Sequence, residues 1–509
     1  MTRLALIAAI VAGAWVALSI STPRVEGCAF SRAPHTYEAM RSRTAYLVGE
    51  ELAGFNMIDA ADTFFGTPRL ETGVRGERAL VDEPYVPPTL LKATGWIESA
   101  MAQAAPSVPW GATGPALISF DCGHGIMQIT SGMTSPGDGS WPSQRQALVA
   151  THFLYNIGRG SAILADKWNG APEVRPIAGT DTGSDPHIVE NWYFAVWSYN
   201  GFTGPGANRS NHPMDPDYAW PRTGFSCSPF DDGYGHSYGN YPYQELVFGC
   251  AARPPRVDSE QLWEALGLSL PDLDDPTWSE PLSLDNFTSS DWYARMDMET
   301  PRPSHEDETA RPSDAATELL RGTPYISASH TSVIDDETEV LISNAGTGIL
   351  PWRAKTSASW ITIDKQGGVA LSQDVPCAPD VTCERVATLT ISLDRERAPP
   401  GEAAWVDLQN LVTGNVWQIH VDAEPPAHPG DANCDGLVSA LDATGVLQYS
   451  ARIVDSLPCL KNANVNASIG VDGVDALLIL QFSAGLITSL GPVQPTPAPT
   501  PIPTPIGTP

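Results

Sequence analysis

The chain has 509 residues, which is enough for two to four domains that each bury a core of their own. Its formal net charge at pH 7 is −30. Nucleic acids and anionic lipids are both polyanions, so this charge excludes them as general binding partners.

The N-terminal segment has the pattern of an export signal. Arg3 precedes an apolar run over residues 4–20, and Thr22-Pro23 follows near the expected cleavage point. We therefore interpret residues 1–27 as a signal peptide and expect a secreted mature protein without a membrane span. Two alternatives stay open: an uncleaved membrane anchor, and a lipid attached to Cys28.

An exported protein can form disulfides, and this chain has eight cysteines. Eight cysteines allow 105 pairings, so the connectivity stays open at this point. No zinc-binding pattern of the CxxC or HExxH type occurs, and we expect no cofactor for catalysis. Proximity along the chain suggests the pairs Cys227–Cys250, Cys377–Cys383 and Cys434–Cys459, which leaves Cys28 for Cys122.

Residues 28–250 are rich in aromatic residues, Gly and Cys, and we expect one folded domain there. In the stretch 94–101 a single carboxylate, Glu98, lies among apolar neighbours on a predicted helix. An apolar pocket disfavours the charged form of a carboxyl group and so raises its pKa. A glycosidase needs such a proton donor for the leaving oxygen, which makes Glu98 the first candidate catalytic residue.

Two further stretches follow Glu98-Ser99 in a fixed order. The first reads Gly125-Ile126-Met127-Gln128-Ile129-Thr130, and the second ends in Tyr199-Asn200. In this order the three motifs resemble the lytic transglycosylase and g-type lysozyme family, with Asn156-Ile157-Gly158 matching a helix of that family. The resemblance covers roughly residues 90–205. It implies a mainly helical, lysozyme-like α+β catalytic domain.

The resemblance also assigns roles, residue by residue. It implies that Glu98 is the catalytic acid/base. It further implies that Met127 and Gln128 line a sugar groove, and that Tyr199 and Asn200 close the site around Glu98 and the substrate's N-acetyl group. Thr130 and Asp121 are further candidates for substrate binding. The chain departs from the family pattern in two places, an inserted loop over residues 106–119 and a Tyr-rich region over residues 205–250.

The number of carboxylates bears on the mechanism. Ordinary glycosidases need a pair that flanks the bond, whereas transglycosylases of this family work with one Glu and leave an anhydro sugar. Thr130 stands where a g-type lysozyme has an Asp, and Asp121 is either a second carboxylate or a turn residue beside Cys122. We therefore expect non-hydrolytic cleavage of β-1,4 bonds in a peptidoglycan-type polymer.

Two other functions stay open. One is a non-catalytic glycan-binding or structural protein that keeps the same groove. The other is a chitin- or chitosan-directed hydrolase on the same fold. The intact set of Glu98, Gln128 and Tyr199-Asn200 favours an enzyme over the first of these.

The composition changes after this domain. Residues 251–322 are rich in Pro, Asp, Glu and Ser, and we expect an acidic linker. Residues 323–424 contain short alternating apolar runs between Gly-containing turns, a pattern typical of an all-β sandwich. They resemble a BACON-type or other immunoglobulin-like accessory domain. Trp352 and Trp360 either stack on sugars or belong to the core or turns.

Residues 428–490 contain a repeat, because 431–454 align with 464–487 at a constant shift. Each half opens with a possible twelve-residue calcium loop and continues into one helix. This arrangement resembles a type I dockerin, a small α module that binds cohesin-bearing scaffold proteins. The candidate ligands are Asp431, Asn433, Asp435, the Leu437 carbonyl, Ser439 and Asp442 in the first loop, and Asn464, Asn466, Ser468, Asp472 and Asp475 in the second.

The two loops are expected to differ in calcium affinity. Gly436 occupies the sharp-turn position of the first loop, whereas the second has Ile469 there and lacks both early carboxylates. We therefore expect Ca²⁺ in both loops, with the first site stronger. Residues 491–509 alternate Pro and Thr and should form an extended tail.

Overall fold

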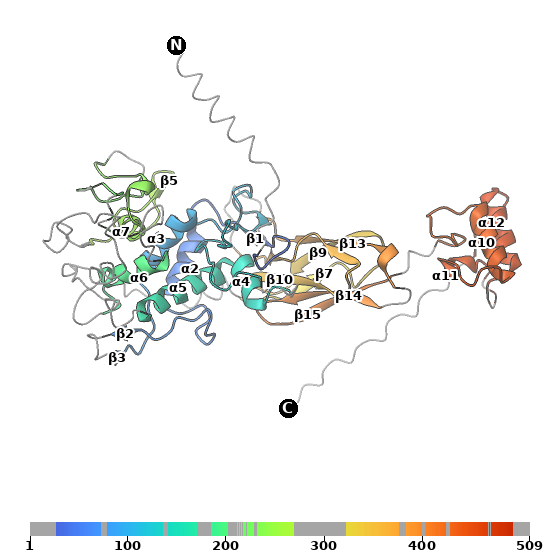
Figure 1. Cartoon of the computed structure of the whole chain (residues 1–509), viewed down its shortest axis with the longest axis horizontal. Coiled ribbons are helices and arrows are strands. Elements are labelled where there is room, and N and C mark those ends of the chain that lie inside the picture. Colours follow the sequence, from blue (N-terminus) through green and yellow to red (C-terminus); the bar gives the residue numbers. More distant parts are fainter. Residues whose placement is uncertain are drawn as a thin grey trace, which may run out of the picture.

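The computed structural model describes most of the chain between residues 27 and 491 (Figure 1). The described residues are 27–72, 79–135, 141–170, 185–201, 211, 213, 215, 217–219, 221–228, 232–268, 322–375, 383–399, 403–423, 428–466, 468 and 470–491. Nearly all of the predicted signal peptide and tail, most of the predicted linker, Cys377 and Ile469 lie outside this set. Within it, no helix combines the length and the apolar character that crossing a membrane requires.

A helical body forms the N-terminal part of the described chain. α5 lies at its centre, with α2 and α6 packed on it, and α3 lies between α2 and α7. Its helices are α2 (Thr44–Gly54), α3 (Pro88–Ser99), α4 (Gln144–Thr151), α5 (Phe153–Asn169), α6 (Tyr193–Tyr199) and α7 (Tyr243–Ala252), with short 3-10 turns η1 (Val189–Trp192) and η2 (Tyr238–Asn240). Its strand pairs are β1 (His35–Tyr37) with β4 (Thr113–Pro115), β2 (Glu71–Thr72) with β3 (Ala79–Leu80), and β5 (Arg256–Val257) with β6 (Glu260–Gln261).

Local sequence signals set the ends of the helices that reach the candidate site. α3 starts with Pro88, whose fixed φ suits the first turn of a helix. It ends where Ala100 adopts a left-handed conformation at φ 54°. α4 begins with a capping box in which the side chains of Ser143 and Gln146 each accept a backbone N–H of the other.

The helical body continues beyond residue 250, where we expected it to end. Ala251 and Trp263 are buried in its core, and Leu266 and Leu268 pack against that core. The polar composition that begins near residue 251 hides these apolar anchors. Residues 251–268 of the predicted linker are therefore folded against the helical body.

Residues 326–421 form a β-sandwich. One sheet has the strand order β12-β10-β14-β15-β8 and the other the order β11-β13-β9-β7. β13 and β14 alternate more and less buried residues along their length, because only one face of each strand covers the core. The strands are β7 (Ile326–Ala328), β8 (Ser332–Val333), β9 (Glu337–Asn344), β10 (Ile349–Thr356), β11 (Ile361–Ile363), β12 (Gly367–Leu371), β13 (Ala387–Leu393), β14 (Ala404–Asn410) and β15 (Val416–Val421), with a 3-10 turn η5 (Arg395–Arg397).

Both tryptophans singled out in the sequence lie in the core between the two sheets. Trp352 is 0% exposed and Trp360 is 2% exposed. Of the two alternatives for these residues, the core position is the observed one. Neither side chain can stack on a sugar in this arrangement.

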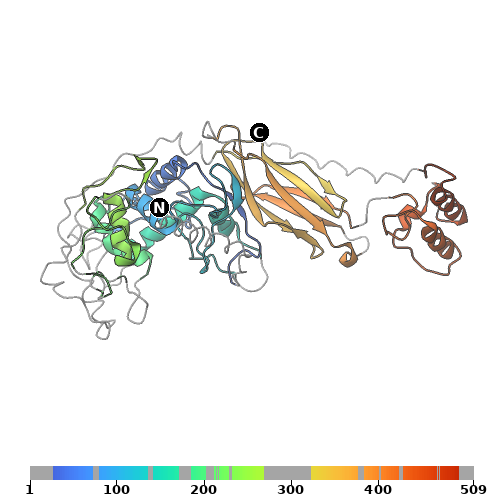
Figure 2. The same ribbon diagram turned by 90° about the horizontal axis from the view of Figure 1, so that it is seen from above.

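The sandwich packs directly against the helical body (Figure 2). β12 lies beside β1 and α4, and β10 also contacts α4. The apolar core of the helical body includes five side chains from the sandwich. They are Ile349, Val369, Leu371, Val375 and Leu411.

A small C-terminal module completes the described chain. Its helices α10 (Ala440–Ser450) and α12 (Gly473–Ser483) pack together, and α11 (Leu460–Ala463) is a single short turn between them in sequence. The two long helices start with equivalent capping boxes. These boxes pair Ser439 with Asp442 and Asp472 with Asp475.

Three of the four suggested disulfides are present, namely Cys28–Cys122, Cys227–Cys250 and Cys434–Cys459. Their presence is compatible with a secreted protein. The fourth suggestion involves Cys377, which lies outside the described residues. Because the Cys28 sulfur is bonded to Cys122, it is not free to carry a lipid, which removes one alternative for the N-terminus.

Candidate active site

Glu98 lies in the last turn of α3. Its neighbour Ser99 connects this turn to the Gly-Ile-Met-Gln-Ile segment. The hydroxyl of its neighbour Ser99 donates hydrogen bonds to the carbonyl oxygens of Gly95 at 3.1 Å and Ile126 at 2.9 Å. Ser99 therefore ties the end of α3 to the Gly-Ile-Met-Gln-Ile segment. This contact gives the Glu-Ser pair a structural reason: the Glu supplies a carboxyl group and the Ser fixes its position.

The surroundings of Glu98 favour its protonated form. Burial, and to a smaller extent the negative charge of Asp121, raise the pKa of Glu98 to about 7. A hydrogen bond from the Tyr243 hydroxyl to Glu98 Oε1, at 2.6 Å, acts in the opposite direction. A carboxyl group with this pKa still carries a proton in a large fraction of molecules at neutral pH, and can donate it.

The segment 124–129 is a tight hairpin, in which the backbone of His124 pairs with that of Ile129. Two buried amide side chains hold it. Asn156 Oδ1 accepts the Met127 N–H at 2.9 Å while Asn156 Nδ2 donates to the His124 carbonyl at 2.7 Å. Gln103 Oε1 accepts the Ile126 N–H at 3.2 Å. The Asn at the start of the Asn-Ile-Gly motif on α5 thus fixes the hairpin beside Glu98.

The three substrate-binding candidates within residues 127–130 lie in different places. The Met127 side chain is fully buried, and a side chain at Gly160 would come within 2.6 Å of its Cγ. The hairpin turns this side chain into the core, where Gly160 leaves room, so a role of Met127 in substrate binding would fall to its backbone. Gln128 is half-buried with a left-handed φ of 44°, and Thr130 is exposed.

Tyr199 lies beside Glu98, at the end of α6. Its hydroxyl donates to the Met127 carbonyl at 2.9 Å. Burial, and then the charge of Glu98, raise the pKa of Tyr199 well above its usual range, so the hydroxyl stays a donor. Asn200 is exposed, and its Oδ1 accepts a hydrogen bond from Asn211 Nδ2 at 2.9 Å.

Asp121 belongs to an exposed turn and also acts on Glu98. Its Oδ1 accepts a hydrogen bond from the Ser119 hydroxyl, and Cys122 next to it has a left-handed φ of 68°. Its charge nevertheless contributes to the raised pKa of Glu98. The turn position is the observed one, and a catalytic role for the Asp121 carboxylate stays a prediction. The preceding residue, Phe120, is 88% exposed.

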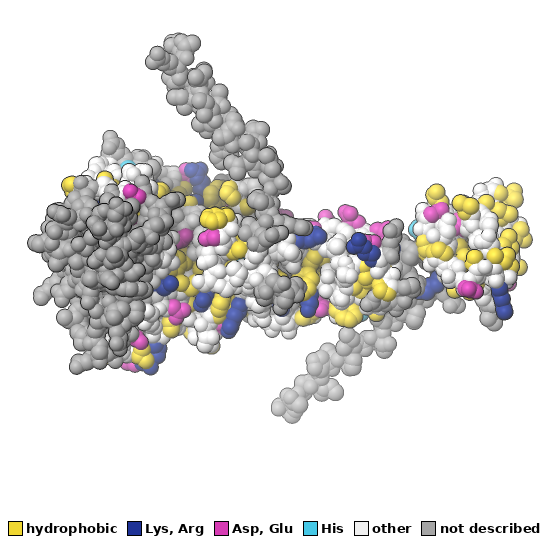
Figure 3. All heavy atoms as spheres, in the orientation of Figure 1, with side chains coloured by type: hydrophobic (Ala, Val, Ile, Leu, Met, Phe, Trp, Pro, Cys, Tyr) yellow, Lys and Arg dark blue, Asp and Glu magenta, His cyan; other side chains and the backbone are white. Residues whose placement is uncertain are grey.

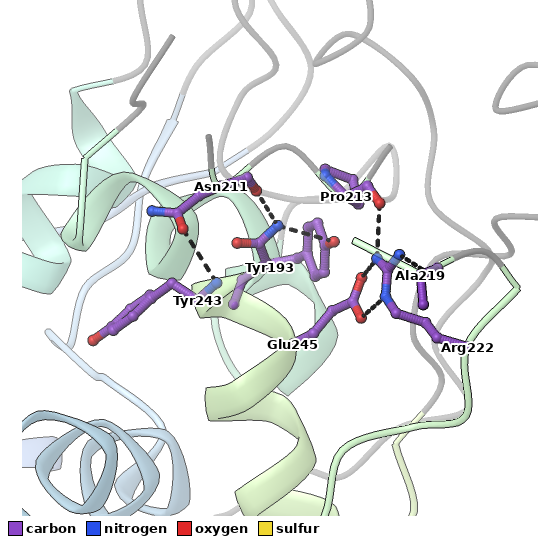
Figure 4. Close-up of polar contacts among 8 residues, drawn as sticks. Tyr193, Asn211, Pro213, Ala219, Arg222, Tyr243 and Glu245 are labelled. Carbon is purple, nitrogen blue, oxygen red and sulfur yellow. Dashed lines mark hydrogen bonds and ion pairs between the residues drawn. The ribbon is translucent and has the colours of Figure 1, made fainter. Parts of the chain in front are cut away.

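Sequence reasoning missed Tyr243, the partner of Glu98. Tyr243 is the first residue of α7, whose start is held by a segment earlier in the chain (Figure 4). Asn211 Oδ1 accepts the Tyr243 N–H at 3.4 Å, and Gln244 Nε2 donates to the Asn211 carbonyl at 2.9 Å. The Tyr-rich region 205–250 was the signal for this residue, but nothing in it identified Glu98 as the contact.

A buried ion pair strengthens the same region. Both oxygens of Glu245 accept hydrogen bonds from Arg222, and Arg222 Nη2 also donates to the Pro213 carbonyl at 2.8 Å (Figure 4). Glu245 lies two residues after Tyr243 on α7. The pair therefore fixes the first turn of the helix that carries the Glu98 partner.

The first candidate calcium loop gathers its carboxylates around one point. One oxygen from each of Asp431, Asp435 and Asp442 lies within 4.8 Å of the others. Gly436 adopts a left-handed φ of 83°, the conformation required at the sharp turn of such a loop. Hard oxygen ligands at this spacing suit Ca²⁺, so the residues present fit the ion.

The other three ligand candidates of this loop surround the carboxylates. Asn433 Nδ2 donates to Asp435 Oδ2 at 2.9 Å, and the Ser439 hydroxyl donates to an oxygen of Asp442 at 3.0 Å. Leu437 is 69% exposed. Because its side chain has no oxygen or nitrogen atom, this residue can bind a metal only through its backbone carbonyl.

The second loop repeats the frame of the first. Asp475 Oδ1 accepts the N–H groups of Val465 at 2.9 Å and Asn466 at 3.2 Å, as Asp442 Oδ1 accepts those of Ala432 and Asn433. The described residues of the second loop therefore share this hydrogen-bond frame, with two candidate carboxylates, Asp472 and Asp475, in place of three.

Two features of the second loop bear on metal binding. Asn464 Oδ1 is buried and has no hydrogen-bond partner within the described part of the chain. Gly470 has a left-handed φ of 101°, one position later than the equivalent of Gly436. Ser468 is exposed, and its N–H donates to Asn466 Oδ1 at 2.7 Å.

Comparison with known proteins adds no assignment. The chain matches no protein-family model, and no curated protein is similar to it in sequence. The function is therefore argued from the residues themselves.

Proposed function

We propose that this protein is a secreted glycan-cleaving enzyme of the lytic transglycosylase type. Its substrate is the β-1,4-linked amino-sugar polymer of peptidoglycan, and Glu98 is the proton donor. One observation carries the proposal: Glu98 has a pKa of about 7 and contacts Tyr243 directly. The Gly-Ile-Met-Gln-Ile hairpin and Tyr199 lie beside it.

The chemistry follows from these contacts. Protonated Glu98 gives its proton to the glycosidic oxygen as the bond from C1 to that oxygen breaks. The 6-hydroxyl of the same sugar then bonds to C1 and returns its proton to Glu98, so no water is consumed. Tyr243 donates to the Glu98 carboxylate and stabilises the ionised form that exists between the two proton transfers.

Asp121 favours a second candidate, hydrolysis. Its charge acts on Glu98 from an exposed turn, where a water molecule could reach the sugar. A chitin- or chitosan-directed hydrolase would use the same pair of residues. The two candidates differ in whether an oxygen atom from water enters the product.

Mass spectrometry of the digestion products distinguishes the candidates. Purified peptidoglycan and chitin oligomers are digested in ¹⁸O-labelled water, with Glu98→Gln protein as the inactive control. We expect unlabelled 1,6-anhydromuramoyl ends from peptidoglycan. One ¹⁸O atom at every new end would show hydrolysis, and the absence of products from both polymers would favour a non-catalytic glycan-binding protein.

We further propose that the C-terminal module binds Ca²⁺ and docks to a cohesin-bearing scaffold protein. The clustered carboxylates of the first loop support the metal. Apolar side chains on the surface support the partner, and Figure 3 shows such side chains over this module. Those on the two long helices are Leu441, Leu447, Val474, Leu477 and Leu480, which are 46% to 70% exposed.

A further inference from the structure

We propose that the β-sandwich is a fixed buttress of the helical body, which holds the hairpin beside Glu98 in position. It would then be neither a tethered accessory domain nor a sugar-binding domain. The association of the two bodies is independent of the proposed function. Its effect on glycan cleavage rests on that function.

The apolar part of the interface is continuous with the core of the helical body. Val369 and Leu371 on β12 and Leu411 after β14 are 1% to 2% exposed and belong to that core. None of the three belongs to the cluster between the two sheets. Domains in one chain move relative to each other unless their interface is large and apolar, and this interface is apolar.

Gly367, the first residue of β12, lies where the sandwich meets the end of α4. A side chain at this position would come within 3.5 Å of Thr151 Cγ2, which is an ordinary contact distance. Thr151 is the last residue of α4. The close approach that favours glycine here lies within the sandwich, because the same side chain would come within 2.8 Å of the Trp352 carbonyl on β10.

Hydrogen bonds fix the orientation of the sandwich. Gln366 Oε1 accepts from the Ser31 hydroxyl at 3.2 Å and from the Arg32 N–H at 3.1 Å. Arg353 Nη1 donates to the Pro142 carbonyl at 2.6 Å, just before α4. Because these contacts involve separate segments of the helical body, they define one orientation.

A short chain of contacts leads from this interface to the hairpin. The Val149 carbonyl on α4 accepts from Asn156 Nδ2 at 3.1 Å, and the Ala150 carbonyl accepts from Gln103 Nε2 at 3.3 Å. Asn156 and Gln103 are the two side chains that hold the hairpin. A shift of α4 away from the sandwich would therefore disturb both.

Cutting the chain between the two bodies tests the association. A protease recognition sequence is inserted within residues 269–321 of the full chain, and the purified protein is cut there. None of the described disulfides joins the two pieces. We expect the pieces to elute together in gel filtration and to separate only in denaturant. Separation under native conditions would overturn the proposal.

Charged substitutions test the interface itself. Leu371→Glu and Leu411→Glu place a carboxylate in the interface from two different elements, and either should separate the cut pieces. The matched control is Leu341→Glu on β9, where the side chain is 44% exposed and the pieces should stay together. Circular dichroism of each variant shows whether the sandwich is still folded. Co-elution of the pieces of both folded interface variants would contradict the proposal.

Hydrogen exchange tests the positioning role without any substrate. After separation, the amides of Ile126 and Met127 should exchange about tenfold faster or more, while those of Val247 and Phe248 on α7 should not change. Unchanged exchange in the hairpin would overturn the positioning role. If the protein cleaved no glycan at all, elution and exchange would still decide this proposal independently of the proposed function.

Discussion

Glu98 and Asp442 both carry a carboxyl group near a helix end. The two groups differ in how many hydrogen bonds they accept. Glu98 lies in the last turn of α3, where the helix dipole is negative, and accepts a described hydrogen bond from Tyr243. Asp442 lies in the first turn of α10, where the dipole is positive, and is fully buried. Its two oxygens accept hydrogen bonds from the N–H groups of Ala432, Asn433 and Ser439 and from the Ser439 hydroxyl.

The comparison shows that burial alone does not decide what a carboxyl group can do. Burial at the negative end of a helix, with few donors, favours a proton carrier. Burial at the positive end, with many donors, fixes the oxygens as acceptors that can face a cation. Substitutions that change a carboxyl group, its hydrogen-bond donor or a nearby charge therefore test the comparison.

The largest effect on glycan cleavage is expected when Glu98 is replaced by a residue that cannot act as an acid. Glu98→Gln keeps the shape of the side chain and cannot donate a proton to a leaving oxygen. Glycan cleavage should fall by about 10²–10⁴-fold. Release of soluble fragments from purified peptidoglycan measures the loss, and an unchanged melting temperature is the control. A loss below about tenfold would place the active site elsewhere.

The next effect concerns the metal. Asp435→Ser gives the first loop the residue that the second loop has at the same position, so calorimetry should show the tighter calcium site weakened. Asp472→Ser is the matched change in the second loop and should leave the tighter site intact. In the unchanged protein, calcium at about 100 times its Kd should stabilise the C-terminal module by about 2.7 kcal/mol. Two sites of equal affinity would contradict the predicted asymmetry.

Removing the described donor to Glu98 should raise the pKa of this carboxyl group. Tyr243→Phe deletes a hydrogen bond that lowers the pKa of Glu98, so this pKa should rise above about 7. Because the acid must be protonated, the alkaline limb of kcat/KM should move to higher pH by about one unit. Tyr238→Phe, whose hydroxyl is not on Glu98, is the control. A shift to lower pH would contradict the assignment of Glu98 as the acid.

The smallest effect is a change in the pKa of Glu98 opposite in direction to that expected for Tyr243→Phe. Asp121→Asn removes a negative charge that raises the pKa of Glu98, while its side-chain oxygen can still accept from Ser119. The alkaline limb of kcat/KM should therefore move to lower pH, by less than about one unit. Asp121 and Tyr243 therefore shift the pKa of Glu98 in opposite directions. An unchanged limb would show that Asp121 lies too far away to matter.

Features carried by neighbouring residues were predictable from the sequence. The first calcium loop is an unbroken run of twelve positions, and Gly436 takes the left-handed conformation that its position requires. The three confirmed disulfides were inferred from chain proximity and elimination. Glu98 was recognisable because apolar residues surround it within one helix, and its raised pKa agrees with that pattern.

Features that depend on distant contacts were not predictable. Tyr243 is 145 residues from Glu98, and no local pattern links the two. Met127 was expected along a groove because of its place in the family motif, but packing against Gly160 turns its side chain into the core. The sandwich showed its own strand pattern clearly. Its docking on α4 depends on the faces that the strands present after they fold.

The disulfide between Cys434 and Cys459 has a consequence for how fast the C-terminal module can respond. It joins the first loop to the residue before α11 across a sequence separation of 25. Closing a loop of this size lowers the entropy of the unfolded chain and so raises its free energy by about 3.5 kcal/mol. If the module binds calcium as proposed, loss of the ion would loosen only a short, tethered segment, and short segments of about ten residues close in well under a microsecond. On the same proposal, the disulfide would let one molecule release and rebind a scaffold protein repeatedly without unfolding.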